Sequence, residues 1–252
     1  MFSTHQPLIK IGEPFIKLLQ VESTNNYALA LVKANKALSG TVIYAQNQTL
    51  GKGQMGKKWL SNENENITLS IILDISSIPL QKQFIISAFT ALGCYDFFKK
   101  YAGNNTAIKW PNDIYFNDKK AGGILIETIN QQEKRWAVIG IGININQKEF
   151  PKNLPNPISL HQITGEIYGV ENMCIDLMDC LNKWLPFLQE NNEEIITTYN
   201  LHLLKKNQTV NLKKGNIKFS CIIKEVNVFG ELVVENGLQT SFQHGEVEWI
   251  ID

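Results

Sequence analysis

The sequence predicts an α+β protein whose second domain is a small antiparallel β-barrel. Three observations support this fold class. Up to residue 204 the chain alternates between apolar strand patterns and amphipathic helix patterns. Residues 205–252 contain only short strands separated by glycine-bearing turns, which is typical of an SH3-like barrel. A chain of 252 residues with 44% hydrophobic and 19% charged residues can bury a core in each domain.

The domain of residues 1–204 is expected to begin with a strand that leads into a helix. Ser23, Thr24 and Asn25 follow the first apolar run, and all three are good helix N-caps. The expected strands of this domain are residues 15–21, 40–46, 67–75, 107–110, 114–116, 122–129 and 136–145. The expected helices are residues 26–36, residues 80–101 and a segment around 174–188.

The domain of residues 205–252 is expected to contain five strands and no helix. Glycine or asparagine stands in each of the intervening turns. These strands are residues 209–212, 217–226, 230–236, 238–242 and 247–251.

Composition and charge argue against several classes of protein. The chain has 24 Lys+Arg and 24 Asp+Glu, so no overall charge favours nucleic acid or an anionic membrane. The N-terminus lacks the apolar core of a signal peptide, and no apolar run is long enough to span a bilayer. The cysteines form no C-x-x-C pair, which favours a reducing compartment and predicts a cytoplasmic protein. They are Cys94, Cys174, Cys180 and Cys221.

The segment GKGQMG, residues 51–56, has the G-x-G-x-x-G spacing of a dinucleotide-binding turn. That motif requires a helix directly after the third glycine, with its N-terminus facing the pyrophosphate. The chain continues instead with KKWLSNENEN, which has no apolar stripe, so the dinucleotide interpretation fails. Glycines beside Lys52, Lys57 and Lys58 suit a phosphate or carboxylate ligand, although a solvated surface loop explains them equally well.

Two further segments place lysines beside polar or small residues. In KWPND, residues 109–113, proline favours an extended tryptophan and brings a lysine close to an amide and a carboxylate. These groups suit a phosphate-binding lysine with a nearby carboxylate that orders magnesium. A plain Pro-Asn-Asp turn is the alternative. In KAGGILIE, residues 120–127, small residues follow a lysine at the start of an apolar strand, where a ligand can approach the backbone. A strand start with a solvated lysine is the alternative there.

The segment GIGININ, residues 140–146, alternates strictly with period two. Its isoleucines face one side of a strand and can fill a core. Gly140, Gly142 and Asn144 face the other side, where a plain buried strand would carry bulky side chains. We therefore predict that this second face forms the wall of a pocket for a flat ligand.

Together these segments resemble the biotin–protein ligases, which attach biotin to a carboxylase carrier domain. That family carries G-R-G-R-x-G-R-x-W, K-W-P-N-D, K-x-x-G-I-L-x-E and G-x-G-x-N. This chain has GKGQMGKKW, KWPND, KAGGILIE and GIGIN in the same order, preceded by STN at residues 23–25. The resemblance covers roughly residues 15–146. It implies a class II synthetase-like catalytic domain, in which helices flank a mixed central sheet, followed by the SH3-like barrel.

The resemblance also implies a reaction in two steps. Biotin and ATP, with Mg²⁺, give biotinyl-5′-adenylate and pyrophosphate. A lysine of the biotin carboxyl carrier domain of acetyl-CoA carboxylase, or of a related carboxylase, then takes the biotinyl group. Lysines near the α-phosphate and a closing glycine loop fit this chemistry. A homodimer through the central sheet is a further implication.

The family's site residues can be carried over position by position. The resemblance implies catalytic roles for Lys52, Lys109, Lys120 and Asp113, of which Asp113 would also bind the metal. The biotin site would consist of Ser23, Thr24, Asn25, Gln46, Lys52, Gly53, Gln54, Lys120, Gly122 and Gly123. The nucleotide site would consist of Gly51, Lys52, Gln54, Trp59, Lys109, Asn112, Gly140, Gly142 and Asn144.

Two departures from the family pattern have consequences. Lys52 and Gln54 stand where the family has arginines, so the bidentate contacts of a guanidinium are lost and a looser hold on the adenylate is expected. Some members also carry an N-terminal helix-turn-helix and act as repressors. Only about 14 residues precede the first expected strand here, so no DNA binding is expected.

Two other functions are compatible with parts of the sequence. A lipoate–protein ligase shares the superfamily fold and the adenylation chemistry but recognises another acid. A non-catalytic module could instead bind a protein or RNA partner through the lysines of the barrel. Glutamates offset those lysines and no aromatic stripe accompanies them, so a solvated surface explains them better.

Overall fold

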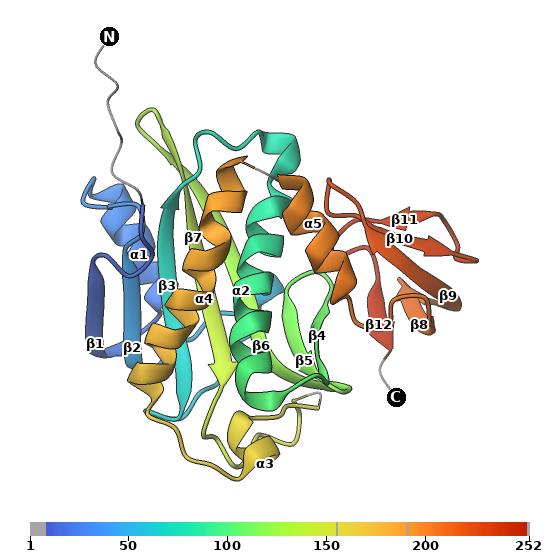
Figure 1. The fold of residues 1–252 in the computed structure, drawn as a ribbon, viewed down its shortest axis with the longest axis horizontal. Helices are drawn as coiled ribbons and strands as arrows, with labels where there is room; N and C mark the ends of the chain where they lie inside the picture. The colour runs from blue at the N-terminus through green and yellow to red at the C-terminus, as the bar shows by residue number, and fades with distance from the viewer. Residues whose placement is uncertain (1–8, 155, 191, 251–252) are drawn as a thin grey trace.

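A computed structural model of the protein describes residues 9–154, 156–190 and 192–250. Residues 1–8, where no signal peptide is expected, and Ile251, which ends the last expected strand, lie outside the described residues. Figure 1 shows a large sheet covered by helices and a separate, smaller sheet formed by the C-terminal part of the chain. The predicted α+β class and the mixed central sheet are both confirmed.

The large sheet has seven strands in the order β1-β2-β3-β7-β6-β5-β4. The pair β1–β2 is parallel and the other pairs are antiparallel. Its strands are β1 (Phe15–Val21), β2 (Val42–Gln48), β3 (Asn66–Asp74), β4 (Thr106–Lys109), β5 (Asp113–Phe116), β6 (Lys119–Gln131) and β7 (Lys134–Asn144). The long strands β3, β6 and β7 lie next to one another, which places the glycine pattern of β7 at the centre of the sheet.

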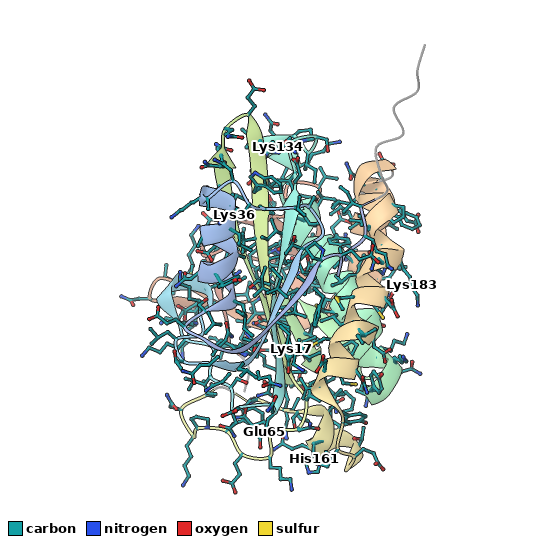
Figure 2. All side chains as sticks on the ribbon, turned by 90° about the vertical axis from the view of Figure 1, so that its left-hand side faces the viewer. Lys17, Lys36, Glu65, Lys134, His161 and Lys183 are labelled. Atoms are coloured by element: carbon teal, nitrogen blue, oxygen red, sulfur yellow. The ribbon has the colours of Figure 1, made fainter. Side chains whose placement is uncertain are left out.

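Helices cover both faces of this sheet. Figure 2 shows the sheet from its β1 side, with α1 on one face and α4 on the other. The helices are α1 (Thr24–Lys33), α2 (Phe84–Ala102), α3 (Leu160–Thr164), α4 (Val170–Glu190) and α5 (Asn192–Leu201), with 3-10 turns η1 (Gln54–Gly56) and η2 (Leu80–Lys82). Helix α2 is apolar almost all round because it packs between the sheet, α4 and α5.

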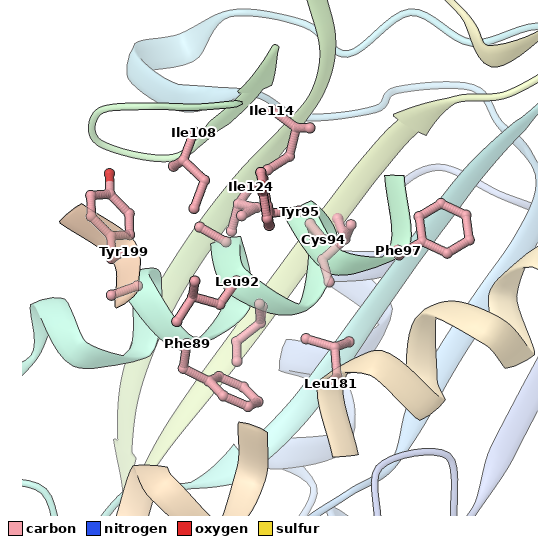
Figure 3. Packing of buried hydrophobic residues seen from close by; sticks show 14 of the residues in the cluster. Phe89, Leu92, Cys94, Tyr95, Phe97, Ile108, Ile114, Ile124, Leu181 and Tyr199 are labelled. Carbon is pink, nitrogen blue, oxygen red and sulfur yellow. The ribbon is translucent and has the colours of Figure 1, made fainter. Parts of the chain in front are cut away.

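The main hydrophobic core lies between the sheet and helices α2, α4 and α5. Figure 3 shows α2 side chains such as Phe89 and Leu92 packed between Leu181 of α4 and the sheet residues Ile114 and Ile124. On the opposite face α1 closes a smaller cluster that includes Ala28, Val32, Ile43, Ile72 and Val138. The α1 helix covers only part of that face, so the rest is free to build a site.

The C-terminal sheet is antiparallel, with strand order β11-β10-β9-β8-β12. Its strands are β8 (Thr209–Lys214), β9 (Ile217–Val226), β10 (Leu232–Glu235), β11 (Ser241–Phe242) and β12 (Glu248–Ile250). It is tied to the larger part by Asn200, whose side chain bonds both backbone groups of Val226 at 2.7 and 2.8 Å. Trp110 Nε1 donates to Gly230 O at 2.9 Å. The division at residues 204 and 205 and the SH3-like barrel stay predictions.

We predict that Gly93→Ala destabilises the protein, because a Cβ at Gly93 would lie 2.5 Å from Leu181 Cδ2 and 3.1 Å from Leu181 Cα. Alanine favours a helix over glycine by up to about 1 kcal/mol, but overpacking a core costs about 1–3 kcal/mol. The midpoint of thermal unfolding should therefore fall for Gly93→Ala. In a Leu181→Ala background the same substitution should cost less, and equal costs in both backgrounds would contradict the packing explanation.

Candidate functional site

A cluster of polar side chains lies at the start of α1, and three of them, Thr24, Asn25 and Ser70, are buried. Gln48 Oε1 accepts hydrogen bonds from the backbone N–H of Thr24 (2.8 Å) and from its hydroxyl (3.1 Å). Ser70 Oγ lies 2.7 Å from the Thr24 hydroxyl and donates to Asn25 Oδ1 at 2.5 Å. Asn25 Nδ2 in turn donates to Glu127 Oε2 at 2.8 Å. We call these five residues the α1 cluster.

The α1 cluster connects the start of the helix to the glycine loop, residues 51–59. Ser23 precedes the helix, and its hydroxyl is used as the N-cap, accepting from the backbone N–H of Asn26 at 3.4 Å. At the other end Glu127 Oε1 lies 3.9 Å from Lys52 Nζ. Apart from Glu127 the cluster is uncharged, so its donors and acceptors suit a neutral polar group such as an amide or a urea.

The glycine face of β7 seats two side chains of the protein itself. A Cβ at Gly140 would lie 2.4 Å from Asn25 Oδ1, and one at Gly142 would lie 2.3 Å from Trp59 Cε2. The two glycines therefore let Asn25 and Trp59 lie directly on the strand. The sequence predicted a bare wall for a ligand, whereas the structure shows that protein side chains cover this part of it. Trp59 Nε1 is buried and has no hydrogen-bond partner within the part of the chain that the structure describes.

The glycine loop folds as a small closed hairpin. Gly53 N donates to Lys57 O at 2.7 Å, and Trp59 N donates to Gly51 O at 2.9 Å. A Cβ at Gly51 would lie 2.4 Å from Trp59 O, so this close approach requires glycine. At the tip Met55 has φ of 52° and is 72% exposed. Between β2 and β3 the loop contains only the 3-10 turn η1 and no α-helix, which agrees with the rejection of a dinucleotide turn.

A second cluster, of charged side chains, lies at the ends of β4, β5 and β6. Lys120 Nζ forms an ion pair with Asp113 Oδ1 at 2.6 Å. The neighbouring strands pair Lys109 with Asp113, and Asp113 with Gly123. A Cβ at Gly123 would lie 3.3 Å from both Asp113 Oδ1 and Lys120 Nζ, so the missing side chain leaves room beside the ion pair. We call Lys109, Asp113 and Lys120, together with the nearby Lys57 of the glycine loop, the lysine cluster.

The lysine cluster has an excess of positive charge. Burial lowers the pKa of Lys109, Asp113 opposes this shift, and the nearby ammonium groups of Lys120 and Lys57 lower the pKa further. Three cations thus face a single carboxylate that already pairs with one of them. Such a site binds an anion favourably, because each added negative charge relieves repulsion between the lysines.

Two asparagines predicted as ligands instead hold the backbone. Asn112 is 5% exposed and its side-chain Nδ2 donates to Ile124 O, which fastens the turn between β4 and β5 to β6. Asn144 is 4% exposed, and its Nδ2 donates to Ile158 O at 3.1 Å and to Lys120 O at 3.4 Å. Both side chains therefore stabilise the backbone next to the lysine cluster.

Two other predicted residues lie away from the two clusters. Gly122 faces the main core, where its Cβ would lie 3.2 Å from Ile143 Cγ1, so only Gly123 faces the site. Gln46 lines an open cavity of about 450 Å³ with Tyr44 and Tyr168. The family resemblance implied that Gln46 binds biotin together with Thr24, whereas in the structure the glutamine bonded to Thr24 is Gln48.

Three residues of the site were missed by the sequence analysis. Gln48 is the last residue of β2, and the expected strand ended two residues too early. Ser70 and Glu127 lie at inward-facing positions of β3 and β6, and only the pairing of these strands with β7 brings them near Asn25. A period-two reading of the KAGGILIE strand could have placed Glu127 on the same face as Gly123.

Three residues of the glycine loop, Gly51, Lys58 and Trp59, line an open cavity of about 350 Å³. It extends along one side of the glycine loop and reaches Gln48 of the α1 cluster. Its lining includes Gln48, Gly51, Lys58, Trp59, Asn62 and Gln147.

The residues fit a magnesium ion only in a limited way. Among the described residues no group of three or more His, Cys, Asp or Glu side chains could hold a metal. Magnesium is often held by one or two carboxylates together with substrate phosphates, so Asp113 could be the protein ligand. One Asp113 oxygen is already bonded to Lys120, which leaves most of the coordination to phosphate oxygens and water.

Comparisons with known proteins identify the family. The sequence profile of the Biotin/lipoate A/B protein ligase family matches residues 18–144. The Bifunctional ligase/repressor BirA of Bacillus subtilis (strain 168) is 38% identical over 177 residues, covering 69% of this chain and 54% of that protein. The Biotin–[acetyl-CoA-carboxylase] ligase of Mycobacterium tuberculosis is 30% identical over 131 residues, covering 51% and 48%. The chain spans about half the length of these curated relatives.

A solved structure extends the similarity to nearly the whole chain. The biotin protein ligase from Aquifex aeolicus, in complex with biotin and ATP, matches with a TM-score of 0.78 at 26% identity, covering 94% of this chain and 99% of that one. The match therefore includes both the large sheet and the C-terminal sheet. The chain belongs to the Biotin/lipoate A/B protein ligase family.

We predict that Asn112→Ala lowers the stability of the fold. The substitution leaves the buried Ile124 carbonyl without its side-chain donor, which costs about 1–3 kcal/mol. Denaturant unfolding should show this loss, whereas Asn104→Ala, in an exposed turn, should unfold like the wild type. Equal stabilities of all three proteins would contradict the supporting role of Asn112.

Proposed function

We propose that this chain is an ATP-dependent biotin–protein ligase. One observation carries the proposal: a largely buried polar cluster, neutral except for Glu127, and a cluster of three lysines lie on the same side of the sheet. Biotin has a neutral ureido ring at one end and a carboxylate at the other. The α1 cluster suits the ring, and the lysine cluster suits the carboxylate and the phosphates of ATP. The names of the relatives point to the same activity.

In the first step biotin's carboxylate oxygen attacks the α-phosphorus of ATP and pyrophosphate leaves. Two anions must meet, so Lys109 and Lys120 offset the charge that gathers on the phosphoryl oxygens. Asp113 orients Lys120 through their 2.6 Å ion pair. A magnesium ion, held by Asp113 and by phosphate oxygens, would supply further neutralisation.

In the second step the amine of a carrier lysine attacks the biotinyl carbonyl. An amide forms, AMP leaves and a proton is released from the attacking amine. The mixed anhydride must be kept from water between the steps. The glycine loop is suited to this task, because Lys52 joins it to the α1 cluster and Trp59 anchors its end on β7.

The partner is a biotin carboxyl carrier domain of a carboxylase, and the protein acts in the cytoplasm as a possible homodimer. The four cysteines are free and buried, which fits a reducing compartment. No helix within the described part of the chain is long and apolar enough to cross a bilayer.

Lipoate ligation is the nearest alternative reaction, and the α1 cluster argues against it. A dithiolane ring has no N–H donors and only weak acceptors, so it cannot exchange hydrogen bonds with the polar groups around Thr24 and Asn25 as a ureido ring can. Sites that bond a polar group reject analogues that lack it.

The function can be tested by intact-mass measurement of a carrier domain after incubation with the protein and Mg-ATP. Parallel samples contain biotin, lipoate or neither acid. We expect the mass of one biotin amide to be gained in the biotin sample alone. A mass gain with lipoate alone would show that lipoate, not biotin, is the acid transferred. No gain with either acid would contradict the ligase function.

We predict that Gln48→Ala weakens biotin binding about tenfold, because Gln48 holds the backbone N–H and the hydroxyl of Thr24 in place in the proposed ring site. Gln46→Ala is the matched control and should bind biotin within about twofold of the wild type, because Gln46 lines a different cavity. Isothermal titration with biotin measures both. If Gln46→Ala weakened biotin binding more than Gln48→Ala did, Gln46 and not Gln48 would be the biotin ligand.

We also predict that Gln54→Arg holds the adenylate longer. A guanidinium adds charge-assisted bonds to the phosphate, each worth about 1.5–3 kcal/mol, so the half-life of the bound intermediate should rise at least about tenfold. Met55→Arg adds the same charge at the exposed loop tip and is the control. Release of labelled biotinyl-5′-adenylate after a single turnover gives the half-life. An unchanged half-life in Gln54→Arg would refute the prediction.

A further inference from the structure

One segment of the C-terminal sheet, residues 244–249, touches several parts of the site. The His244 ring packs edge-on against Trp110, with centroids 6.2 Å apart. A Cβ at Gly245 would lie 2.8 Å from Met55 Cε, so the tip of the glycine loop rests on this turn. Trp249 of β12 lies beside Lys109, whose Nζ is 5.4 Å from the ring centroid.

The Lys109 ammonium lies near two aromatic rings from different sheets. It is 5.4 Å from the centroid of Tyr115 on β5 and also 5.4 Å from that of Trp249. Both distances fall within the range of cation–π attraction, and tryptophan is the strongest partner. The C-terminal sheet therefore supplies the stronger of the two aromatic contacts to a lysine that the larger sheet carries.

No ion pair within the described residues competes with these rings for Lys109. The nearby carboxylate, Asp113, is bonded to Lys120 at 2.6 Å. Aromatic faces attract an ammonium without cancelling its charge, so the full charge of Lys109 stays available to an incoming anion. A carboxylate in the same place would have to be displaced by that anion.

The side chain of Trp249 makes no hydrogen bond within the described residues. Its Nε1 is buried and has no partner among the described residues. Buried indole N–H groups usually find an acceptor, so this donor does not explain why a tryptophan stands here. The polar interaction that the indole does make is the contact of its ring face with Lys109.

We propose that Trp249 is a positioning residue that holds the Lys109 ammonium toward the phosphates of the nucleotide. The C-terminal sheet thereby completes the anion site of the larger domain. This inference rests on the proposed function. It predicts that loss of the indole face weakens phosphate binding and leaves biotin binding unchanged, since the α1 cluster contains no residue of the C-terminal sheet.

The test uses the full chain with tryptophan, phenylalanine, methionine or 5,7-difluorotryptophan at position 249. Methionine fills much of the volume without an aromatic face, and difluorotryptophan keeps the shape while weakening the face. Phe229→Leu, at an exposed position of the same domain, is the control. The KM values for ATP and biotin are measured, together with the Kd of inorganic pyrophosphate by calorimetry.

We expect Trp249→Met to raise the KM for ATP and the Kd for pyrophosphate roughly threefold to thirtyfold, with the KM for biotin unchanged. Trp249→Phe should recover part of the loss, and difluorotryptophan should fall between tryptophan and methionine. In a Lys109→Met background Trp249→Met should have no further effect on pyrophosphate. Circular dichroism confirms that each variant is folded, and difluorotryptophan retains the test if methionine prevents folding.

The inference is overturned if difluorotryptophan binds pyrophosphate like the wild type, or if Trp249→Met weakens biotin as much as ATP. An additive loss in the Lys109→Met background would also overturn it. Pyrophosphate binding requires no turnover, so it reports on Lys109 even if the wild-type protein forms no biotinyl-5′-adenylate. A wild-type protein that forms no biotinyl-5′-adenylate would refute the proposed function without deciding the role of Trp249.

Discussion

The alternation of isoleucine and glycine along β7 is the constraint on which the rest of the site depends. Ile139, Ile141 and Ile143 fill the main core on one face of the strand. On the other face Gly140 and Gly142 leave the backbone bare, and Asn25 and Trp59 lie directly upon it. Because both glycines are central in the sheet, the start of α1 and the end of the glycine loop meet at one place.

Two environments of different polarity follow from this arrangement. Hydrogen bonds connect Gln48, Thr24, Ser70 and Asn25 in a neutral cluster, and Glu127 joins that cluster to Lys52 of the loop. The lysine cluster lies at the ends of β4, β5 and β6 and is cationic. An elongated acid can place its neutral ring in the first cluster and its carboxylate in the second. One face can therefore bind both the acid and the nucleotide that activates it.

Much of the fold could be predicted from the sequence, because long apolar patterns reveal their own period. The strand at β7 is where expected, whereas the first helix begins at Thr24 rather than at residue 26, so that Ser23 is the N-cap among the three candidates. Helix α3 was not expected, since five residues carry too little periodicity, and the ten-residue helix α5 was also missed. Placement in the site depends on strand ends and tertiary pairing. A strand end misplaced by two residues exchanged Gln46 for Gln48, and Asn112 could not be recognised as a backbone support before its partner at Ile124 was known.

Trp59 can lie on β7 only because residue 142 is a glycine, and a biotin titration of Gly142→Ala tests this requirement most directly. The added Cβ would lie 2.3 Å from the Trp59 ring, so the ring and the end of the glycine loop must move. The account predicts that this variant keeps the far-ultraviolet circular dichroism of the wild type and binds biotin at least about tenfold more weakly. A folded variant that binds biotin as tightly as the wild type would contradict the account.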